Sequence, residues 1–389
     1  MIMNKIITLS FLILIMNSSY LLAKKNEETV NHLELASLML RDGHLDRAQL
    51  ALSQVDTSDE NLDLQRFYII SGLLNIRRSN NDQAITFFKD AKKLGAVDAV
   101  INVYLAQAAY SNKNYELVIQ SLDDAGISLD KIPSIYHMRA QSYWHLNNPQ
   151  MAIAVLDQAT AIFTNNKSFP RRKIFYYIEL GYNKKASELG KAYLEEFQSE
   201  SNNVEVNDYV AISNALSASG DTISALHFLE IAKLKFPINQ DIAKSLAAIY
   251  IRNEDYYSAA KIIHDSSYLN SDLVKEAAEL YRRAGAEYLA LSLNGLISDQ
   301  NEKLKQRMAL MLQLGNFEQA AGMENSLKRI NLDKDENIKY ALAYSFFKIS
   351  NFNKAEVYLS QITDTNLFEK AVELRKIMID CKTESWRCQ

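Results

Sequence analysis

Apolar residues recur along the chain at the three- and four-residue spacing of amphipathic helices, in segments separated by short polar turns. The clearest example is residues 209–237, YVAISNALSASGDTISALHFLEIAKLKFP, where two such patterns meet at Gly220 and end at Pro237. Helical periodicity on both sides of a glycine predicts a helical hairpin. Near-copies of this segment follow one another over most of the chain, which indicates a tandem repeat rather than a catalytic motif.

One small apolar residue begins the second helix of each copy and returns roughly every 34 residues. These ten positions are Ala48, Ala84, Val118, Ala152, Ala186, Ala225, Ala259, Ala290, Ala320 and Ala355. Other positions fall into the same register, with a small residue twelve before most of them and a large apolar residue four after. Small residues let two antiparallel helices approach closely, so the pattern predicts one closely packed helix pair per copy.

Five of the eleven glycines occupy a single repeat position, five residues before the small apolar residue. They are Gly43, Gly181, Gly220, Gly285 and Gly315. A glycine at this place predicts that the first helix of each pair ends in a left-handed turn, a backbone conformation that side chains resist.

This pattern resembles the tetratricopeptide repeat (TPR) family. The match in the first-named copy is carried by Ser213, Leu216, Gly220, Ala225, Leu229, Ala232 and Pro237. The resemblance covers roughly residues 30–365. It implies an all-α, right-handed superhelical solenoid of about ten helix-turn-helix units, followed by a C-terminal capping helix. Since members of this family share a shape and not a chemistry, the resemblance is specific for fold and nearly silent about function.

Some copies depart from the pattern. The fifth has Gly190 and Tyr193 where a large apolar and a small residue are expected, respectively. The eighth and ninth copies are short and have Asn294 and Glu324 at a position that is otherwise apolar. We therefore expect shifted or irregular helices in these copies.

The predicted organisation has four parts. Residues 1–23 form a signal peptide, 24–197 an N-terminal array of about five units, 204–365 a C-terminal array of about five units, and 366–389 a capping helix with a cysteine-containing tail. The polar stretch 195–203 lengthens the interval between the fifth and sixth units. We interpret it as a longer loop within one solenoid, with a flexible linker as the alternative. A helix over 367–379 would cover the last apolar face.

The N-terminus has the pattern of a secretory signal. Lys5 precedes an apolar run over residues 6–16, and a more polar stretch leads to a predicted cleavage after Ala23. Eleven residues are too few to span a bilayer, although a run extended to Leu22 leaves an uncleaved anchor as the alternative. The chain is therefore expected in the periplasm or outside the cell, with no membrane span after cleavage.

Both cysteines of the chain, Cys381 and Cys388, lie in its last nine residues. In an exported protein this pairing suggests a small terminal disulfide loop, with two free thiols as the alternative. Their spacing and the lack of a nearby histidine argue against a metal site.

Composition and motifs argue against several function classes. The formal net charge is −4 and the isoelectric point is near 6.0, without a basic block, so nucleic acid is not an expected partner. The six histidines fall on unrelated repeat positions, and no nucleotide, dinucleotide or serine-hydrolase motif is present. We therefore expect no metal, no cofactor and no catalytic centre, and a protein that is not an enzyme.

The resemblance places the ligand-binding surface on the first helix of each unit, which lines a concave groove. Outward positions on these helices predict a row of three lysines followed by two tyrosines, and a polar row in earlier units. The candidate binding residues are Lys244, Lys275, Lys305, Tyr340, Tyr344, His137, Gln141, Gln107 and Asn214. The lysines favour an acidic segment or an anionic polymer, while the amides suit peptide backbone or sugar hydroxyls.

These observations predict a non-catalytic scaffold for protein partners in the cell envelope, in a secretion, uptake or pilus-type assembly. The partner would bind in the groove as an extended or helical segment. The alternative is a carbohydrate-handling accessory in exopolysaccharide export, which would bind a polysaccharide.

Overall fold

The computed structural model describes residues 30–126, 131–198, 204–268 and 270–383 of the chain. These residues form α-helices joined by short turns, with one short 3₁₀ helix and no strand among them. Within this part of the chain, every helix is too short or too polar to cross a membrane. The predicted signal peptide, Cys388 and most of the 195–203 stretch lie outside the described residues, so the predictions made for them stay predictions.

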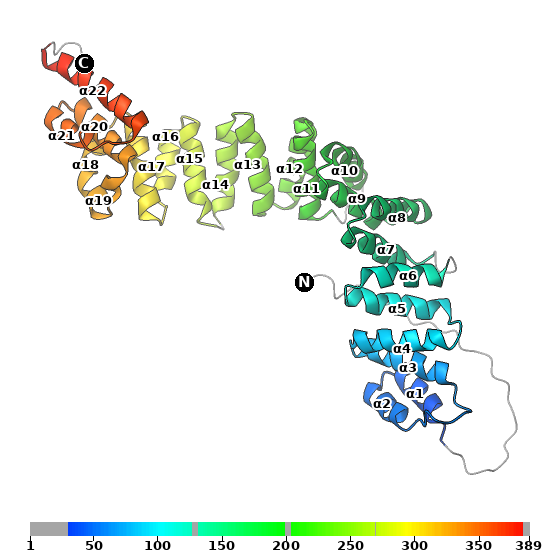
Figure 1. The fold of residues 1–389 in the computed structure, drawn as a ribbon. Helices are drawn as coiled ribbons and strands as arrows, with labels where there is room; N and C mark the ends of the chain where they lie inside the picture. Colours follow the sequence, from blue (N-terminus) through cyan, green and yellow to red (C-terminus); the bar gives the residue numbers. More distant parts are fainter. Residues whose placement is uncertain (1–29, 127–130, 199–203, 269, 384–389) are drawn as a thin grey trace. The chain divides into compact units, whose positions relative to one another are not determined.

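Consecutive helices form antiparallel pairs, and the described residues contain ten such pairs (Figure 1). In the first five the helices are α1 (His32–Arg41) and α2 (Leu45–Ser53), α3 (Leu64–Arg77) and α4 (Asn81–Lys93), α5 (Ala99–Ser111) and α6 (Tyr115–Ala125), α7 (Pro133–His145) and α8 (Pro149–Ile162), α9 (Ser168–Glu179) and α10 (Asn183–Gln198).

The remaining helices continue the order, with one pair interrupted. They are α11 (Val206–Ala218) and α12 (Thr222–Lys235), α13 (Gln240–Arg252) and α14 (Tyr256–Ser267), α15 (Leu273–Arg283) and α16 (Glu287–Asn294), α17 (Gln300–Gln313) with α18 (Phe317–Gly322) and α19 (Glu324–Arg329), the 3₁₀ helix η2 (Leu332–Lys334), α20 (Glu336–Lys348) and α21 (Phe352–Leu359), and α22 (Thr365–Thr383). The predicted capping helix over 367–379 is thus confirmed as the longer helix α22.

The described residues group into two compact units, one up to Val155 and one from Leu156, so the division falls inside α8. The first unit has apolar clusters shared between successive helices of α1 to α6 and the start of α7. In the second unit, α9, α10 and α11 share one cluster through Ile174, Leu194 and Ile212. Helices α10 and α11, which precede and follow residues 199–203, therefore pack together.

The small apolar repeat position is the centre of each pair. Its ten residues, Ala48 through Ala355 in the order given above, are all fully buried with 0% exposure. A larger side chain would hold the two helices apart, since a close-packed interior tolerates added volume poorly. The register predicted from sequence is therefore confirmed in every described pair.

The turn inside each pair has a left-handed residue at the same repeat position. The five predicted glycines all have positive φ, from 72° to 96°. The other five pairs place Ser79, Lys113, Asn147, Glu254 and Ser350 there, with φ between 55° and 62°. The turn is thus a property of the repeat, and glycine relieves its backbone strain in only half of the pairs.

The residue that follows this turn caps the second helix in many pairs. In each such case an Asn or Asp side-chain oxygen accepts a hydrogen bond from the backbone N–H three residues later. These caps are Asn114, Asn148, Asp221, Asp255 and Asn351. Such a cap stabilises a helix by about 1 kcal/mol, so turn and cap together define the start of the second helix.

The irregular copies have physical explanations. Gly190 lies against Ile212 of α11, and a Cβ built at Gly190 would come within 2.5 Å of the Ile212 side chain, so the missing volume is supplied by the next pair. In the eighth pair Asn294 is fully buried, and its amide donates to the Lys303 carbonyl and to Gln306. In the ninth pair the second helix is interrupted at Met323 between α18 and α19. The expected irregularity is confirmed there.

Candidate functional site

The predicted binding residues all lie on first helices of their pairs. Gln107 is on α5 and His137 and Gln141 are on α7, while Asn214, Lys244, Lys275 and Lys305 are on α11, α13, α15 and α17, and Tyr340 and Tyr344 are on α20. Only Asn214, Lys244 and Lys275 are exposed, and the others are half-buried. The structure therefore separates the nine residues into three exposed and six half-buried side chains.

The lysine row differs along its length. Lys244 and Lys275 are exposed at equivalent positions of successive first helices, and neither has an ion-pair partner among the described residues. Lys305 instead pairs with Asp335, the N-cap residue of α20, with 3.1 Å between Nζ and Oδ2. Burial would raise the pKa of Asp335, but the hydrogen bond from Lys305 and one from a backbone N–H outweigh it and lower this pKa. The charges of Lys244 and Lys275 are thus available to a binding partner, whereas Lys305 is paired with Asp335.

The tyrosines of α20 are packing residues. Tyr344 makes an edge contact with Phe317, with 5.8 Å between ring centroids, and lies 6.2 Å from the ring of Phe347. Tyr340, like Tyr344, packs against the apolar cluster that α20 shares with the neighbouring helices. Burial raises the pKa of the Tyr340 hydroxyl. These rings therefore support the end of the array more than they offer a binding surface.

The polar row of the first compact unit is joined to aromatic side chains. The hydroxyl of Tyr110 donates to Oε1 of Gln141 over 2.6 Å. The ring of Tyr110 lies 5.9 Å from that of Tyr115, which stacks on His145 at 4.5 Å. Gln141 thus belongs to a connected group of aromatic and amide side chains. The sequence predicted the amide but not its tyrosine partner.

A buried carboxylate that sequence reasoning missed joins the fifth and sixth pairs. Asp208 of α11 is fully buried, and its Oδ1 accepts from Nε of Arg171 on α9 over 2.7 Å. Arg171 also binds Glu205 over 2.9 Å. Burial raises the pKa of Asp208, although Arg171 opposes the rise. Burial, together with the Asp208 charge, also raises the pKa of the nearby Tyr193 hydroxyl to about 12. We call Arg171, Tyr193, Glu205 and Asp208 the buried charge cluster.

A second carboxylate joins the ninth and tenth pairs. Glu324, the first residue of α19, accepts from Lys328 and Lys354 at 2.7 Å each and from the Tyr358 hydroxyl at 2.8 Å. Its side chain is 15% exposed. Burial would raise the pKa of Glu324, but its three donors outweigh this effect and lower the pKa to about 2. The departure from the repeat pattern at Glu324 thus marks an ionic contact between pairs.

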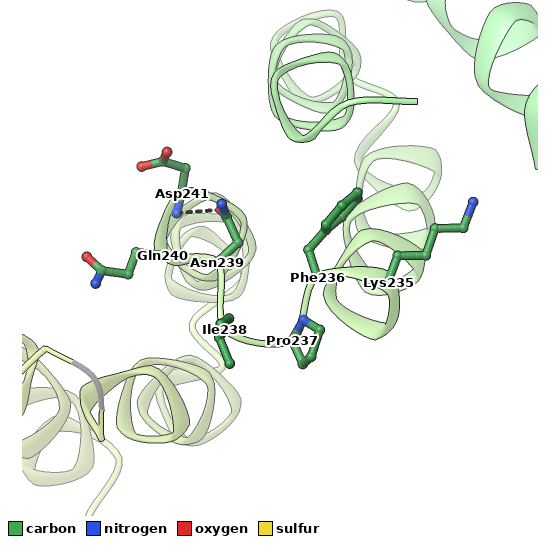
Figure 2. A pocket seen from close by; sticks show the side chains of 7 residues that line it. All are labelled: Lys235, Phe236, Pro237, Ile238, Asn239, Gln240 and Asp241. Carbon is green, nitrogen blue, oxygen red and sulfur yellow. Dashed lines mark hydrogen bonds between the residues drawn. The ribbon is translucent and has the colours of Figure 1, made fainter. Parts of the chain in front are cut away.

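Two open hollows of the described surface lie at turns between helices. One, of about 650 Å³, lies where α12 ends and α13 begins and is lined by Phe236, Pro237 and Ile238 among others (Figure 2). Asn239 caps α13 there by accepting from the Asp241 N–H at 3.0 Å. The other, of about 540 Å³, lies near Glu336 and Lys370. Among the described residues, no group of three or more His, Cys, Asp or Glu side chains is placed to hold a metal ion.

Comparison with known proteins returns no matching family model and no matching curated protein. Solved structures do match. MamA from Desulfovibrio magneticus (residues 41 to its end) is 16% identical, covers 46% of this chain and 99% of its own, and has a TM-score of 0.38. PilF from Pseudomonas aeruginosa is 12% identical over 56% of this chain and 96% of its own, with a TM-score of 0.38. A tetratricopeptide repeat protein from Parabacteroides merdae is 13% identical over 64% and 96%, with a TM-score of 0.40.

Likenesses of this degree say nothing about what this chain binds. The class follows from the chain itself, because its described helices form successive antiparallel pairs with one small buried residue and one left-handed turn at fixed repeat positions. The protein is an all-α array of helical repeats, which is the fold that the resemblance to tetratricopeptide repeats implies.

Proposed function

We propose that the protein is a non-catalytic scaffold that holds a protein partner in an envelope assembly, and that the partner binds along the first helices α11, α13 and α15. One observation carries this proposal: Lys244 and Lys275 recur at one repeat position on successive first helices, exposed and without an ion-pair partner among the described residues. Placement in the envelope rests on the signal pattern at the N-terminus, not on the structure.

The chemistry of this surface suits an acidic segment of protein. Adjacent packed helices lie about 8–10 Å apart, so charges at equivalent positions attract acidic residues spaced along one bound segment. Asn214 of α11 adds an exposed amide, which can both donate to and accept from a peptide backbone. Because helices rather than loops position these side chains, little order has to be gained on binding.

A crosslinking experiment tests the location. A photoreactive residue is introduced at Lys244, at Lys275 and, as a matched control, at Lys184, which is also an exposed lysine and lies on the second helix α10. The proposal expects one and the same protein to be captured from Lys244 and Lys275 in cells. Capture of that protein from Lys184 alone would overturn it.

Binding of acidic peptides tests the chemistry. We expect K244E/K275E to weaken the binding of a glutamate-rich peptide about tenfold and to reduce its dependence on salt, because two favourable charges become unfavourable. The matched control is K184E, at an exposed lysine of the second helix α10. Equal binding by K244E/K275E and the parent protein would contradict the proposed role of these lysines.

A second candidate function, carbohydrate handling, is favoured by one specific observation. On α5 and α7, Gln107, His137 and Gln141 lie at outward repeat positions, and Tyr110 is hydrogen-bonded to Gln141. Aromatic rings beside amides are suited to sugar rings and their hydroxyls. Titration with neutral and acidic oligosaccharides, monitored by tryptophan fluorescence, tests this alternative. Saturable oligosaccharide binding that is abolished in Q141A would favour a carbohydrate ligand over an acidic protein segment.

A further inference from the structure

The outward side of the second helices carries one repeat position whose chemistry changes along the array. It lies two residues before the small buried position and is exposed in every described pair. From the first pair to the tenth it is occupied by Asp46, Asp82, Glu116, Gln150, Lys184, Ile223, Tyr257, Tyr288, Glu318 and Asn353. Seven pairs thus place a polar side chain there. Three consecutive pairs place large apolar ones.

The same three pairs expose a second apolar side chain further along. Leu234 follows Ile223 by eleven residues and Tyr268 follows Tyr257 by eleven, which is three helical turns and returns to the same side of the helix. Leu296 lies just beyond the end of α16, after Tyr288. The exposed fractions of the six range from 52% to 84%. We call Ile223, Leu234, Tyr257, Tyr268, Tyr288 and Leu296 the apolar ladder.

The ladder is more than scattered surface apolarity. Single exposed apolar residues are ordinary, but residues of this size at one repeat position on three successive helix pairs concentrate apolar surface on one face. Two of the tyrosine rings are also held in place. Tyr257 contacts the ring of Tyr281 at 5.6 Å, and Tyr268 stacks on His264 at 5.5 Å. Because these rings are already ordered, a partner that covers them causes little further loss of side-chain freedom.

The net charge of the helices that carry the ladder changes sign from one end to the other. With histidine neutral, α12 carries Glu230, Lys233 and Lys235 for a net +1, α14 carries Lys261 and Asp265 for a net of zero, and α16 carries Glu287 for a net −1. A two-fold axis through α14 would therefore place the positive helix of one copy against the negative helix of the other. An interface of two identical patches is the commonest arrangement in protein dimers.

We propose that the apolar ladder is an interface through which two copies of this chain form a symmetric dimer. Three tyrosines and three aliphatic side chains of this exposure offer about 800 Å², which is what one partner contributes to an interface of standard size. Tyrosines near the axis supply the buried centre. Lys235 and Glu287, which within one copy contact Tyr209 and Gln313, meet across the rim. The partner is thus a second copy, and the first helices stay available to other ligands.

The test is the mass of the full chain in solution, measured by sedimentation equilibrium from 1 to 100 μM. One copy has a mass of 44.3 kDa, and we expect twice this mass for the parent protein. Y257D/Y288D should weaken association at least 100-fold. Both residues are exposed, and circular dichroism verifies that the variant folds. The matched control Q150D changes the same repeat position outside the ladder and should leave the dimer intact.

A charge exchange tests the symmetry. K235E or E287K alone should weaken association about tenfold, because each brings like charges together across the rim, and K235E/E287K together should restore it. A parent protein that is monomeric at 100 μM overturns the proposal and leaves a different protein as the occupant of the ladder. A dimer that survives Y257D/Y288D overturns it too, because the interface then lies elsewhere.

Discussion

The two carboxylates that join successive helix pairs, Asp208 and Glu324, make the same kind of contact in different surroundings. Asp208 is fully buried and depends on one guanidinium, that of Arg171, which it shares with Glu205. Glu324 is partly exposed and accepts hydrogen bonds from three side chains on two helix pairs. Their pKa values move in opposite directions, upward for Asp208 and downward for Glu324.

This difference shows that burial alone does not make an ionic contact strong. Removing a carboxylate from water disfavours its charged form, and only sufficient donors compensate for the loss. Glu324 has three such donors, so its charged form loses little stability when it leaves water. Asp208 has fewer donors. Its contact with Arg171 therefore holds two helix pairs in register more than it lowers the free energy of folding.

The largest effect is expected from D208A. The substitution leaves Arg171 without its buried partner and removes the capping interaction of Asp208 with the Glu205 N–H. We expect the free energy of unfolding, measured by urea denaturation, to fall by about 3 kcal/mol. The control R171M/D208L replaces the pair by apolar side chains and should lose less than D208A. A loss below about 1 kcal/mol in D208A would show that the contact is dispensable.

The next effect separates the two carboxylates by pH. The pKa of Glu324 falls from an ordinary 4.5 to about 2 in the folded protein, so its contribution is full above 4.5 and is lost as the pH falls towards 2. The difference in unfolding free energy between the parent and E324Q should be about 2 kcal/mol at pH 7 and shrink to nearly zero at pH 2.

Asp208 should show the opposite sign. Its folded pKa lies above the ordinary 3.8, so protonation of Asp208 favours folding. This contribution is fully present below pH 3.8 and is lost as the pH rises through the folded value. Comparing D208N with the parent over pH 3 to 7 measures it. Equal pH slopes in D208N and E324Q would remove the distinction between the two contacts.

A smaller effect is expected from Y358F, which deletes one of the three donors to Glu324 and keeps the ring. Loss of this hydrogen bond should lower the unfolding free energy by about 1 kcal/mol. It should also raise the pKa of Glu324, which a carboxyl titration by nuclear magnetic resonance detects. Y281F, which removes a buried tyrosine hydroxyl elsewhere, is the control and should leave that pKa unchanged.

The smallest effects are expected from the two lysines around Glu324. Lys328 and Lys354 are 48% and 50% exposed, so K328M and K354M should each cost about 0.5 kcal/mol or less at neutral pH. K354M removes an ion pair between the ninth and tenth pairs, whereas the ion pair of Lys328 with Glu324 lies within α19. Lys328 reaches the tenth pair through the ring of Tyr358, at 5.7 Å. Thermal unfolding in low and high salt measures both variants, and a larger loss in K328M would show that Lys328 contributes more than the ion pair between the two pairs.

The repeat register was predictable because it depends on residues close together in the sequence. Ala225 and its nine counterparts could be aligned without any structure, and the five turn glycines followed from them. Lys113 and Glu254 could not be foreseen as left-handed residues, since their side chains favour no such turn and only packing of the two helices imposes it. The interruption at Met323 was foreseen only as an irregularity.

The candidate site was predictable only in its positions. Equivalent placement of Lys244, Lys275 and Lys305 on first helices follows from the repeat, but the pairing of Lys305 with Asp335 depends on a contact thirty residues away. The same holds for Arg171 and Asp208, which lie 37 residues apart. Cys381 is buried in α22, whereas its predicted partner Cys388 lies outside the described residues, so the disulfide stays a prediction.

The packing of each helix mainly on its nearest neighbours in sequence has a consequence for how the chain acquires its structure. Short loops close quickly, and contacts local in sequence form early in folding. A helix pair can therefore fold against the pair before it while later segments are still being synthesised. Loss of one contact between pairs, such as that of Asp208 with Arg171, should then slow the folding of the later pair. The preceding pairs should still fold.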